Sequence, residues 1–248
     1  MTGMLWVRTV SRGQGQSAVR AAAYCGRRCL YDERRGRTFN FARRPGLAYS
    51  EWLLPAGAFW QGYDSGRFWN AIEHHARRAN ARLAREVIMA LPRSLSCEGQ
   101  IALARGFLDE GFVSAGHAVE WHLHQDRPHN PHVHALVSFA RVTAAGFEPP
   151  EAAFDRRAFL VGLHGLWRRH WERAGGEARS GSGPAGFHLG ASHALMQRGV
   201  ITRQGQRLAA LQALSRRPPP RRWPPWLRLR LRRLERTRVR VRARGRGD

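Results

Sequence analysis

Alternation of residue type along two neighbouring segments constrains the fold of this chain more than any other feature. Apolar and polar residues alternate from His117 to His124, and they alternate again from His132 to Ser138. Side chains two residues apart on a strand lie on the same face of a sheet. The pattern predicts two half-buried strands, joined by the polar connection 125–131 into an antiparallel hairpin with one apolar face and one histidine-rich face.

Three histidines share the polar face of this expected hairpin, with His132 and His134 on one strand and His124 on the other. Directly opposed residues have Cβ atoms about 4.5–5.5 Å apart. Three neutral imidazoles at that separation can hold a metal ion with coordination positions left open, which is typical of a catalytic site. His122 shares the face of His124 and is a candidate fourth ligand, and the alternative is a merely polar sheet face.

The remaining periodicity predicts the elements around the hairpin. Strands are expected at residues 4–10 and 86–91, and helices at 18–28, 66–82, 96–111 and 155–174. Residues 31–63 have no firm periodicity and indicate a loop with short strands. Strands that alternate with helices, together with an antiparallel hairpin, predict an α+β domain: a mainly antiparallel sheet covered by helices.

The charge of the chain is strongly positive and unevenly distributed. The 42 basic residues are all arginine and oppose 18 acidic residues, which gives a net charge of +24. From Arg216 to Asp248 there are 14 arginines and 2 acidic residues, so 14 − 2 = +12 of the net charge lies there. The excess favours nucleic acid as the partner. We expect one domain over residues 1–214 and a disordered Arg/Pro-rich tail over 215–248.

Cysteine usage and hydropathy exclude two other classes of protein. Cys25, Cys29 and Cys97 contain no CxxC pair and are too few for a disulfide framework. Cys25 and Cys29 are four apart on an expected helix and could offer two thiolate ligands, although core packing or chance is the more common reason for such a spacing. No segment reaches membrane-spanning length, and no signal peptide is visible. The sequence therefore predicts a soluble cytoplasmic protein without membrane insertion.

Five segments carry more specific motifs: SRGQGQSAVRAAAYCGR, ARLAREVIMALPRSLS, HQDRPHNPHVHALVS, LWRRHWERAG and FHLGASHALMQRGVITR. Together they resemble the MobA/MobL-type relaxases, the DNA-nicking enzymes of mobilisable plasmids, over about residues 4–205. The resemblance implies a sheet of the HUH endonuclease class. It also implies a site-specific and strand-specific nick at a transfer origin in single-stranded or melted DNA. Accessory mobilisation proteins and a coupling protein are implied as further partners.

The resemblance also assigns residues. His132 and His134 are implied to be the HxH pair and His124 the third ligand. Tyr24, in the SAxxAAAY pattern, is implied to be the nucleophile, with Tyr31 as the fallback candidate.

One position departs from the family. Glu86 is expected to orient a ligand histidine or assist proton transfer, or else to form a structural ion pair with an arginine. Many relatives have Glu-x-Glu there, and this chain has Ile88 at the second position. The chain also has an arginine-rich segment where many relatives continue into long domains, so either a minimal or a degenerating copy is expected.

DNA contacts are expected from side chains near these motifs. Arginine forks suit phosphate, and aromatic rings stack on bases. The residues expected to contact a single strand are Arg12, Arg20, Arg27 and Arg28, with Trp6, Trp52, Trp60 and Trp69 as candidate stacking residues.

The chemistry expected of the site follows from the nature of a phosphodiester. Cutting and later resealing it needs a nucleophile that conserves the bond energy in a covalent ester, which a tyrosine oxygen can do. A free phenol has a pKa of about 10 and is protonated at neutral pH. A divalent ion, manganese or magnesium with zinc as the alternative, would stabilise the charge that develops on the phosphate. The products would be a 5′-phosphotyrosyl strand and a free 3′-hydroxyl.

Two other functions are compatible with the sequence. A rolling-circle replication initiator or a transposase would use the same chemistry at a different DNA site. A non-catalytic nucleic-acid-binding protein would use its basic residues alone, with the histidines in a structural role.

Overall fold

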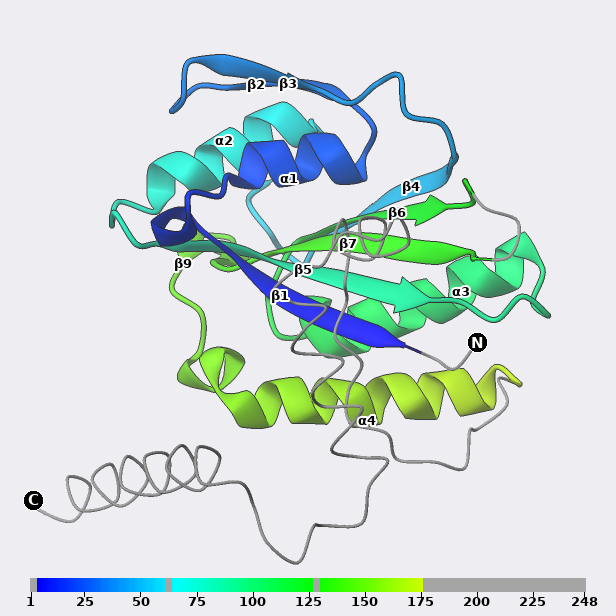
Figure 1. Cartoon of the computed structure of the whole chain (residues 1–248). Coiled ribbons are helices and arrows are strands. Elements are labelled where there is room, and N and C mark those ends of the chain that lie inside the picture. The colour runs from blue at the N-terminus through cyan, green and yellow to red at the C-terminus, as the bar shows by residue number, and fades with distance from the viewer. Residues whose placement is uncertain (1–3, 61–63, 127–129, 176–248) are drawn as a thin grey trace, which may run out of the picture. The chain divides into compact units, whose positions relative to one another are not determined.

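Five antiparallel strands form the central sheet of the computed structural model, in the order β1-β5-β7-β6-β4 (Figure 1). The strands are β1 (Leu5–Ser11), β4 (Leu47–Leu53), β5 (Arg82–Ala90), β6 (Val119–His124) and β7 (His132–Ser138). The structure describes residues 4–60, 64–126 and 130–175. The predicted α+β fold with a mainly antiparallel sheet is confirmed.

Two helices cover each face of the sheet (Figure 1). On one face lie α3 (Cys97–Leu108) and α4 (Arg157–Arg173), and on the other lie α1 (Ala18–Cys25) and α2 (Ser65–His75). The odd-numbered residues of the hairpin, among them Val119, Trp121 and Val133, are fully buried against α3 and α4. The histidines of the hairpin therefore point to the α1/α2 face, as the alternation predicts.

On the α1/α2 face, the core beneath α1 consists of short side chains, and the core beneath α2 consists of aromatic side chains. Ala18, Val19 and Ala22 of α1 are fully buried, and such short side chains let the helix lie close to the sheet. Phe68 and Trp69 fill the space beneath α2. Gly26, directly after α1, continues this close approach, because a Cβ atom there would lie 3.1 Å from Cε1 of His122.

Glu120 of β6 joins the sheet to both helices of this face. Its buried carboxylate accepts hydrogen bonds from Trp69 Nε1 (2.6 Å) and Ser65 Oγ (2.8 Å), both on α2. It also pairs with Arg28, just beyond α1, at 2.8 Å. Burial raises the pKa of Glu120, and Trp69, Arg28 and Ser65 favour the ionised form and limit the rise.

Strand β5 begins earlier than its predicted start at residue 86, because its arginines have aromatic partners. Arg85 is 3% exposed, yet its guanidinium lies 4.8 Å from the ring centroid of Phe154 and donates to the carbonyl oxygen of Phe154 at 2.7 Å. Arg82 stacks on Phe139 at 5.0 Å. Charged residues thus form the start of β5, and Arg82 belongs to this strand rather than to the preceding helix predicted over 66–82.

The predicted helix 66–82 is too long at its end, since α2 stops at His75. The chain turns there because the guanidinium of Arg12 binds the main-chain carbonyls of Ala76 and Arg78. The predicted helix 18–28 is also too long, since α1 ends at Cys25 and is followed by Gly26 and by Arg27 at a φ of 52°. A strand begins at Cys29, so Cys25 and Cys29 do not share a helix.

Smaller elements complete the described part. Helix α3 continues into the π-helical turn η2 (Asp109–Val113), and two short 3-10 helices are η1 (Arg12–Gln14) and η3 (Ala152–Asp155). Strands β2 (Cys29–Asp32) and β3 (Arg37–Asn40) form one hairpin, and β8 (Arg141–Thr143) and β9 (Gly146–Glu148) form another. Within the described ranges, no helix has the length and apolar character needed to cross a membrane.

Several predictions fall on residues outside the described ranges: the break at 175–186 beyond its first residue, the helical pieces up to 214, and the tail 215–248. The chain divides into two compact units, Met1–Gly186 and Phe187–Asp248. The fold and the site below belong to the first unit.

We expect His117 to make the stability of the metal-free protein depend on pH. The side chain is 1% exposed, and burial lowers its pKa from 6.5 to about 4. The unfolded chain therefore binds more protons between these values, and stability falls as the pH falls. The loss is about 1.4 kcal/mol per pH unit, or about 3 kcal/mol over the window from pH 6.5 to 4.

Urea unfolding of wild type and His117→Gln with chelator, at pH 7 and pH 5, measures this contribution. Glutamine keeps a donor for the carbonyl of Ser138, which His117 Nδ1 contacts at 2.9 Å. Other buried histidines are the same in both proteins, so the difference in slope belongs to His117. An equal slope in both would contradict the assignment.

Candidate metal and nucleophile site

The β6–β7 hairpin brings His124, His132 and His134 together on the α1/α2 face. His124 pairs with His132 across the two strands, and His134 follows two residues later. Their ring centroids are 4.8 to 5.4 Å apart, and one nitrogen of each lies within 4.8 Å of the others. The juxtaposition predicted for these three residues is thus present, and we call them the histidine triad.

Each ring of the histidine triad has one nitrogen held by a neighbour. Nε2 of His124 lies 2.7 Å from the carbonyl oxygen of Cys25, and Nδ1 of His132 lies 2.8 Å from that of Asn130. Nδ1 of His134 lies 3.2 Å from Oε1 of Glu86. Each of these nitrogens donates to its oxygen, so the lone pair of each ring is on the other nitrogen.

Burial disfavours protonation of two members of the histidine triad, His124 and His132. Burial, reinforced by the neighbouring His134, lowers the pKa of His124 from 6.5 to about 3, and burial also lowers the pKa of His132. A metal ligand must be an unprotonated imidazole. Three rings with one acceptor nitrogen each, oriented by hydrogen bonds at the opposite nitrogen, fit a divalent cation.

A second group of potential ligands, Cys25, Glu86 and His134, lies next to the histidine triad. Its donor atoms are less suited to a cation. Burial and the charge of Glu86 raise the pKa of the Cys25 thiol, which remains protonated and lies 3.8 Å from Oε1 of that carboxylate. A thiol binds metals as its thiolate. The histidine triad therefore fits a divalent cation better than this second group does.

Glu86 contacts both a triad histidine and an arginine, the two partners expected for it. Oε1 faces His134, and Oε2 pairs with Arg8 of β1. Burial raises the pKa of Glu86, but the hydrogen bond with His134 and the charge of Arg8 outweigh it, and the net shift is downward. Ile88 lies directly across from His134 in the β5–β7 pairing, so an apolar side chain occupies the position next to the triad.

Tyr24, in the last turn of α1, lies beside the histidine triad. Its ring centroid is 5.9 Å from that of His134 and 5.4 Å from that of Phe41. The helix starts at Ser17, whose side chain accepts a hydrogen bond from the backbone of Arg20. It ends with the carbonyl of Cys25 bound to His124, so the helix is attached to the site one residue after Tyr24.

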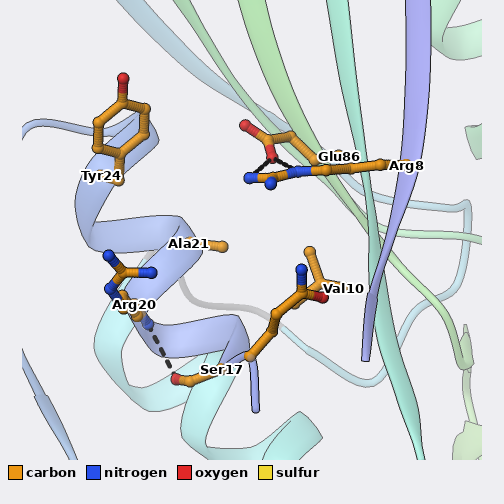
Figure 2. A pocket seen from close by; sticks show the side chains of 8 residues that line it. Arg8, Val10, Ser17, Arg20, Ala21, Tyr24 and Glu86 are labelled. Carbon is orange, nitrogen blue, oxygen red and sulfur yellow. Dashed lines mark hydrogen bonds and ion pairs between the residues drawn. The ribbon is translucent and has the colours of Figure 1, made fainter. Parts of the chain in front are cut away.

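A cavity of about 180 Å³ opens between α1 and the β1/β5 edge of the sheet. Figure 2 shows Tyr24 and Arg20 on its helix side and Arg8 and Glu86 on its strand side. Two guanidinium groups and a tyrosine therefore border a space next to the triad, where an anionic group can approach the phenol.

The fallback nucleophile, Tyr31, is not on the helix of Tyr24. It lies on β2, with a side chain 53% exposed, and its backbone carbonyl accepts from Asn70. Helix α1 ends at Cys25 and β2 begins at Cys29, so Tyr31 is carried away from the helix. The structure brings Tyr24, and not Tyr31, to the histidine triad.

The four arginines expected to bind DNA differ in their surroundings. Arg12 is bonded to the Glu73 carboxylate at 2.8 Å and to three main-chain carbonyls, which is a structural role. Arg28 pairs with the buried Glu120. Arg20 is exposed beside the cavity, and Arg27 lies over the Tyr24 ring at 5.0 Å.

The sequence reasoning missed Arg8 and Arg44. Arg44 is exposed and lies 5.0 Å from the Tyr24 ring centroid and 5.6 Å from that of Phe41. It follows β3 within the segment 31–63, where no periodicity gave a position relative to Tyr24. The sequence does contain a clue to Arg8. It lies two residues before Val10 on β1, so the two side chains point to the same face of the sheet.

His122 and three of the tryptophans do not take the roles proposed for them. His122 is fully buried, its Nδ1 lies 2.9 Å from Ser50 Oγ, and it is not among the atoms that could share one cation. Three tryptophans pack in the aromatic core beneath α2 rather than projecting from the surface: Trp52, Trp60 and Trp69. Trp6 is half-buried on β1, next to Arg8 at 5.4 Å.

Comparison with known proteins agrees with this geometry. The model of the MobA/MobL family matches residues 16–174, which include α1, the hairpin and α4. The chain belongs to the MobA/MobL family.

Curated relatives of this family member include a conjugal transfer protein TraA of Agrobacterium fabrum, 37% identical over 154 residues. The match spans 58% of this chain and 14% of that protein. A mobilization protein MobL of Acidithiobacillus ferridurans is 37% identical over 123 residues, which cover 50% of this chain and 32% of that one. The chain thus spans less than a third of the length of these two relatives.

A solved structure has the same fold. It comes from work titled "Molecular Basis of Vancomycin Resistance Transfer in Staphylococcus aureus", and the TM-score is 0.63 at 24% identity. The alignment covers 72% of this chain and 97% of that one.

We expect Glu86→Gln to weaken the binding of Mn²⁺ or Zn²⁺ by about 10- to 100-fold, the usual effect of removing a carboxylate that orients a ligand histidine. Isothermal titration of the metal into chelator-treated protein measures the change. Glu51→Gln is the matched control, because Glu51 lies on β4 and pairs with Arg105, away from the triad. Equal affinities of Glu86→Gln and wild type would show that His134 is oriented without Glu86.

Proposed function

We propose that this protein is a relaxase: a metal-dependent enzyme that nicks one strand of single-stranded or locally melted DNA at a transfer origin and remains attached to it through Tyr24. One observation carries the proposal. A tyrosine lies with its ring 5.9 Å from a histidine that belongs to a three-histidine cluster. This combines a group able to form a phosphate ester with a place for a divalent ion.

The reaction is a transesterification. Oη of Tyr24 attacks the scissile phosphorus, a P–O bond to the tyrosine forms, and the P–O3′ bond breaks. The phenolic proton passes to water, and O3′ takes up a proton as it leaves. The products are a 5′-phosphotyrosyl strand and a free 3′-hydroxyl, and resealing is the reverse reaction.

His124, His132 and His134 would hold the ion. A bound divalent ion would withdraw charge from the non-bridging phosphate oxygens as the new ester forms. The three histidines are compatible with manganese or magnesium, and zinc is favoured by affinity order.

Glu86 acts in this proposal as a positioning residue rather than as the proton acceptor. Its pKa is lowered, and its two oxygens are occupied by His134 and Arg8. A carboxylate in that state is a weak base. It holds the His134 ring in the tautomer whose other nitrogen is free for the ion.

Arginines around the phenol complete the proposed DNA site. Arg20 borders the cavity, and Arg27 and Arg44 both lie 5.0 Å from the Tyr24 ring centroid. We place the phosphates that flank the nick against these three residues. Arg12 and Arg28 are committed to the buried carboxylates of Glu73 and Glu120, and we leave them out of the DNA contacts.

The cellular setting is part of the same proposal. The names of the curated relatives refer to conjugal transfer and mobilisation. We infer that this chain works in plasmid mobilisation in the cytoplasm, with accessory mobilisation proteins and a coupling protein as partners.

We expect Tyr24→Phe to abolish the covalent protein–DNA adduct and to leave DNA affinity within a factor of about three, under 0.7 kcal/mol. Phenylalanine retains the ring that contacts Phe41, His134 and the two arginines. A denaturing gel with tiled single-stranded oligonucleotides from DNA flanking the gene, with manganese or with chelator, detects the adduct.

Tyr31→Phe serves as the control and should form the adduct at the wild-type level. An undiminished yield of adduct in Tyr24→Phe would refute the assignment of Tyr24 as the nucleophile. A nick mapped to a replication origin or an element end would favour a replication initiator or a transposase.

A further inference from the structure

Arg27 has a backbone conformation that its residue type disfavours. Its φ of 52° is the only positive value at a non-glycine residue in the described ranges. It occupies the left-handed position of a helix end in which Arg28 N–H binds the carbonyl of Ala23 at 2.9 Å. Glycine is the usual residue there, because a Cβ atom makes this conformation costly. Such a cost at a functional site suggests a use for the side chain.

The Arg27 side chain lies between the nucleophile and the histidine triad. Its guanidinium is 5.0 Å from the Tyr24 ring centroid, and Nη2 is 3.4 Å from Nδ1 of His124. Its Nε is buried without a hydrogen-bond partner among the described residues. The protein therefore leaves one donor of this cation unsatisfied, and a further acceptor can use it.

Arg27 and a metal ion need the same lone pair. Nε2 of His124 donates to the Cys25 carbonyl, so Nδ1 is the acceptor nitrogen of that ring. That nitrogen is the one that Arg27 faces. A guanidinium is always a donor and always positive, so it opposes a cation at this position by occupying the lone pair and by repulsion.

We propose that the guanidinium of Arg27 takes the place of the metal ion at His124 while the site is empty. This guanidinium holds His124 when no ion is bound, and it turns to the phosphate presented to Tyr24 when the triad holds one. The second half of the proposal rests on the proposed nicking function. The first half concerns metal binding alone.

The proposal has a thermodynamic consequence. DNA that draws Arg27 to a phosphate frees Nδ1 of His124, so DNA raises metal affinity, and the ion raises DNA affinity by the same factor. Metal and substrate would then bind cooperatively through a single side chain. Without Arg27, each would bind independently of the other apart from their direct attraction.

The first test is a titration of Mn²⁺ into the chelator-treated full chain without DNA. We expect Arg27→Gly to bind Mn²⁺ at least about tenfold more tightly than wild type, about 1.4 kcal/mol. Glycine adopts the φ of 52° freely, so the variant removes the side chain without straining the helix end. Arg27→Lys, which keeps a charge on a compact group, should lie between the two.

Arg44→Ala is the matched control. Arg44 lies at the same 5.0 Å from the Tyr24 ring but has no contact with the triad histidines in the described part of the chain. Its loss should leave Mn²⁺ affinity unchanged. Equal Mn²⁺ affinity in wild type and Arg27→Gly, or equal tightening by Arg44→Ala, would overturn the proposal.

The second test repeats the titration with a single-stranded oligonucleotide that supports adduct formation. The oligonucleotide should raise Mn²⁺ affinity of wild type by at least about fivefold, within the usual range of such couplings, and clearly less in Arg27→Gly. Equal coupling in both proteins would overturn the second half. Failure of nicking appears separately, as the absence of an adduct in wild type with manganese, while the titration without DNA still decides the first half.

Discussion

The buried carboxylate of Glu120 is the point on which the geometry of the α1/α2 face depends. A single side chain of β6 binds two residues of α2 and, through Arg28, the chain just after α1. A buried charge stabilises a fold only weakly, because its desolvation offsets the attraction. Its partners are nevertheless fixed in direction, so it determines how both helices lie on the sheet. The distance between Tyr24 and the histidine triad follows from that arrangement.

The hairpin could be predicted from the sequence because its two faces differ so sharply. Val119, Trp121 and Val133 go into the core against α3 and α4, which forces the histidines to the opposite face. When one face of a sheet is buried, period-two alternation determines which side chains lie on that face. The position of His124 opposite the His132/His134 pair therefore followed from local pattern, without knowledge of the helices.

The remainder of the site depends on contacts between segments distant in sequence, which local pattern does not contain. Nothing in α1 alone shows that Tyr24 faces the triad, and that assignment came from the family motif. Arg44 reaches the same ring from a segment without periodicity. The helix ends were wrong for a similar reason. Arg12 draws away the carbonyls that would continue α2, and the left-handed turn at Arg27 ends α1.

The hydrogen bond from His124 to the carbonyl of Cys25 makes the site self-aligning. The helix that carries the tyrosine is attached directly to a ring of the cluster, one residue from the tyrosine itself. A tilt of α1 against the sheet would move that ring with the helix, so the spacing between Tyr24 and the histidine triad would change less than the packing around it. In the nicking reaction proposed above, such coupling would keep the phenol and the histidines aligned.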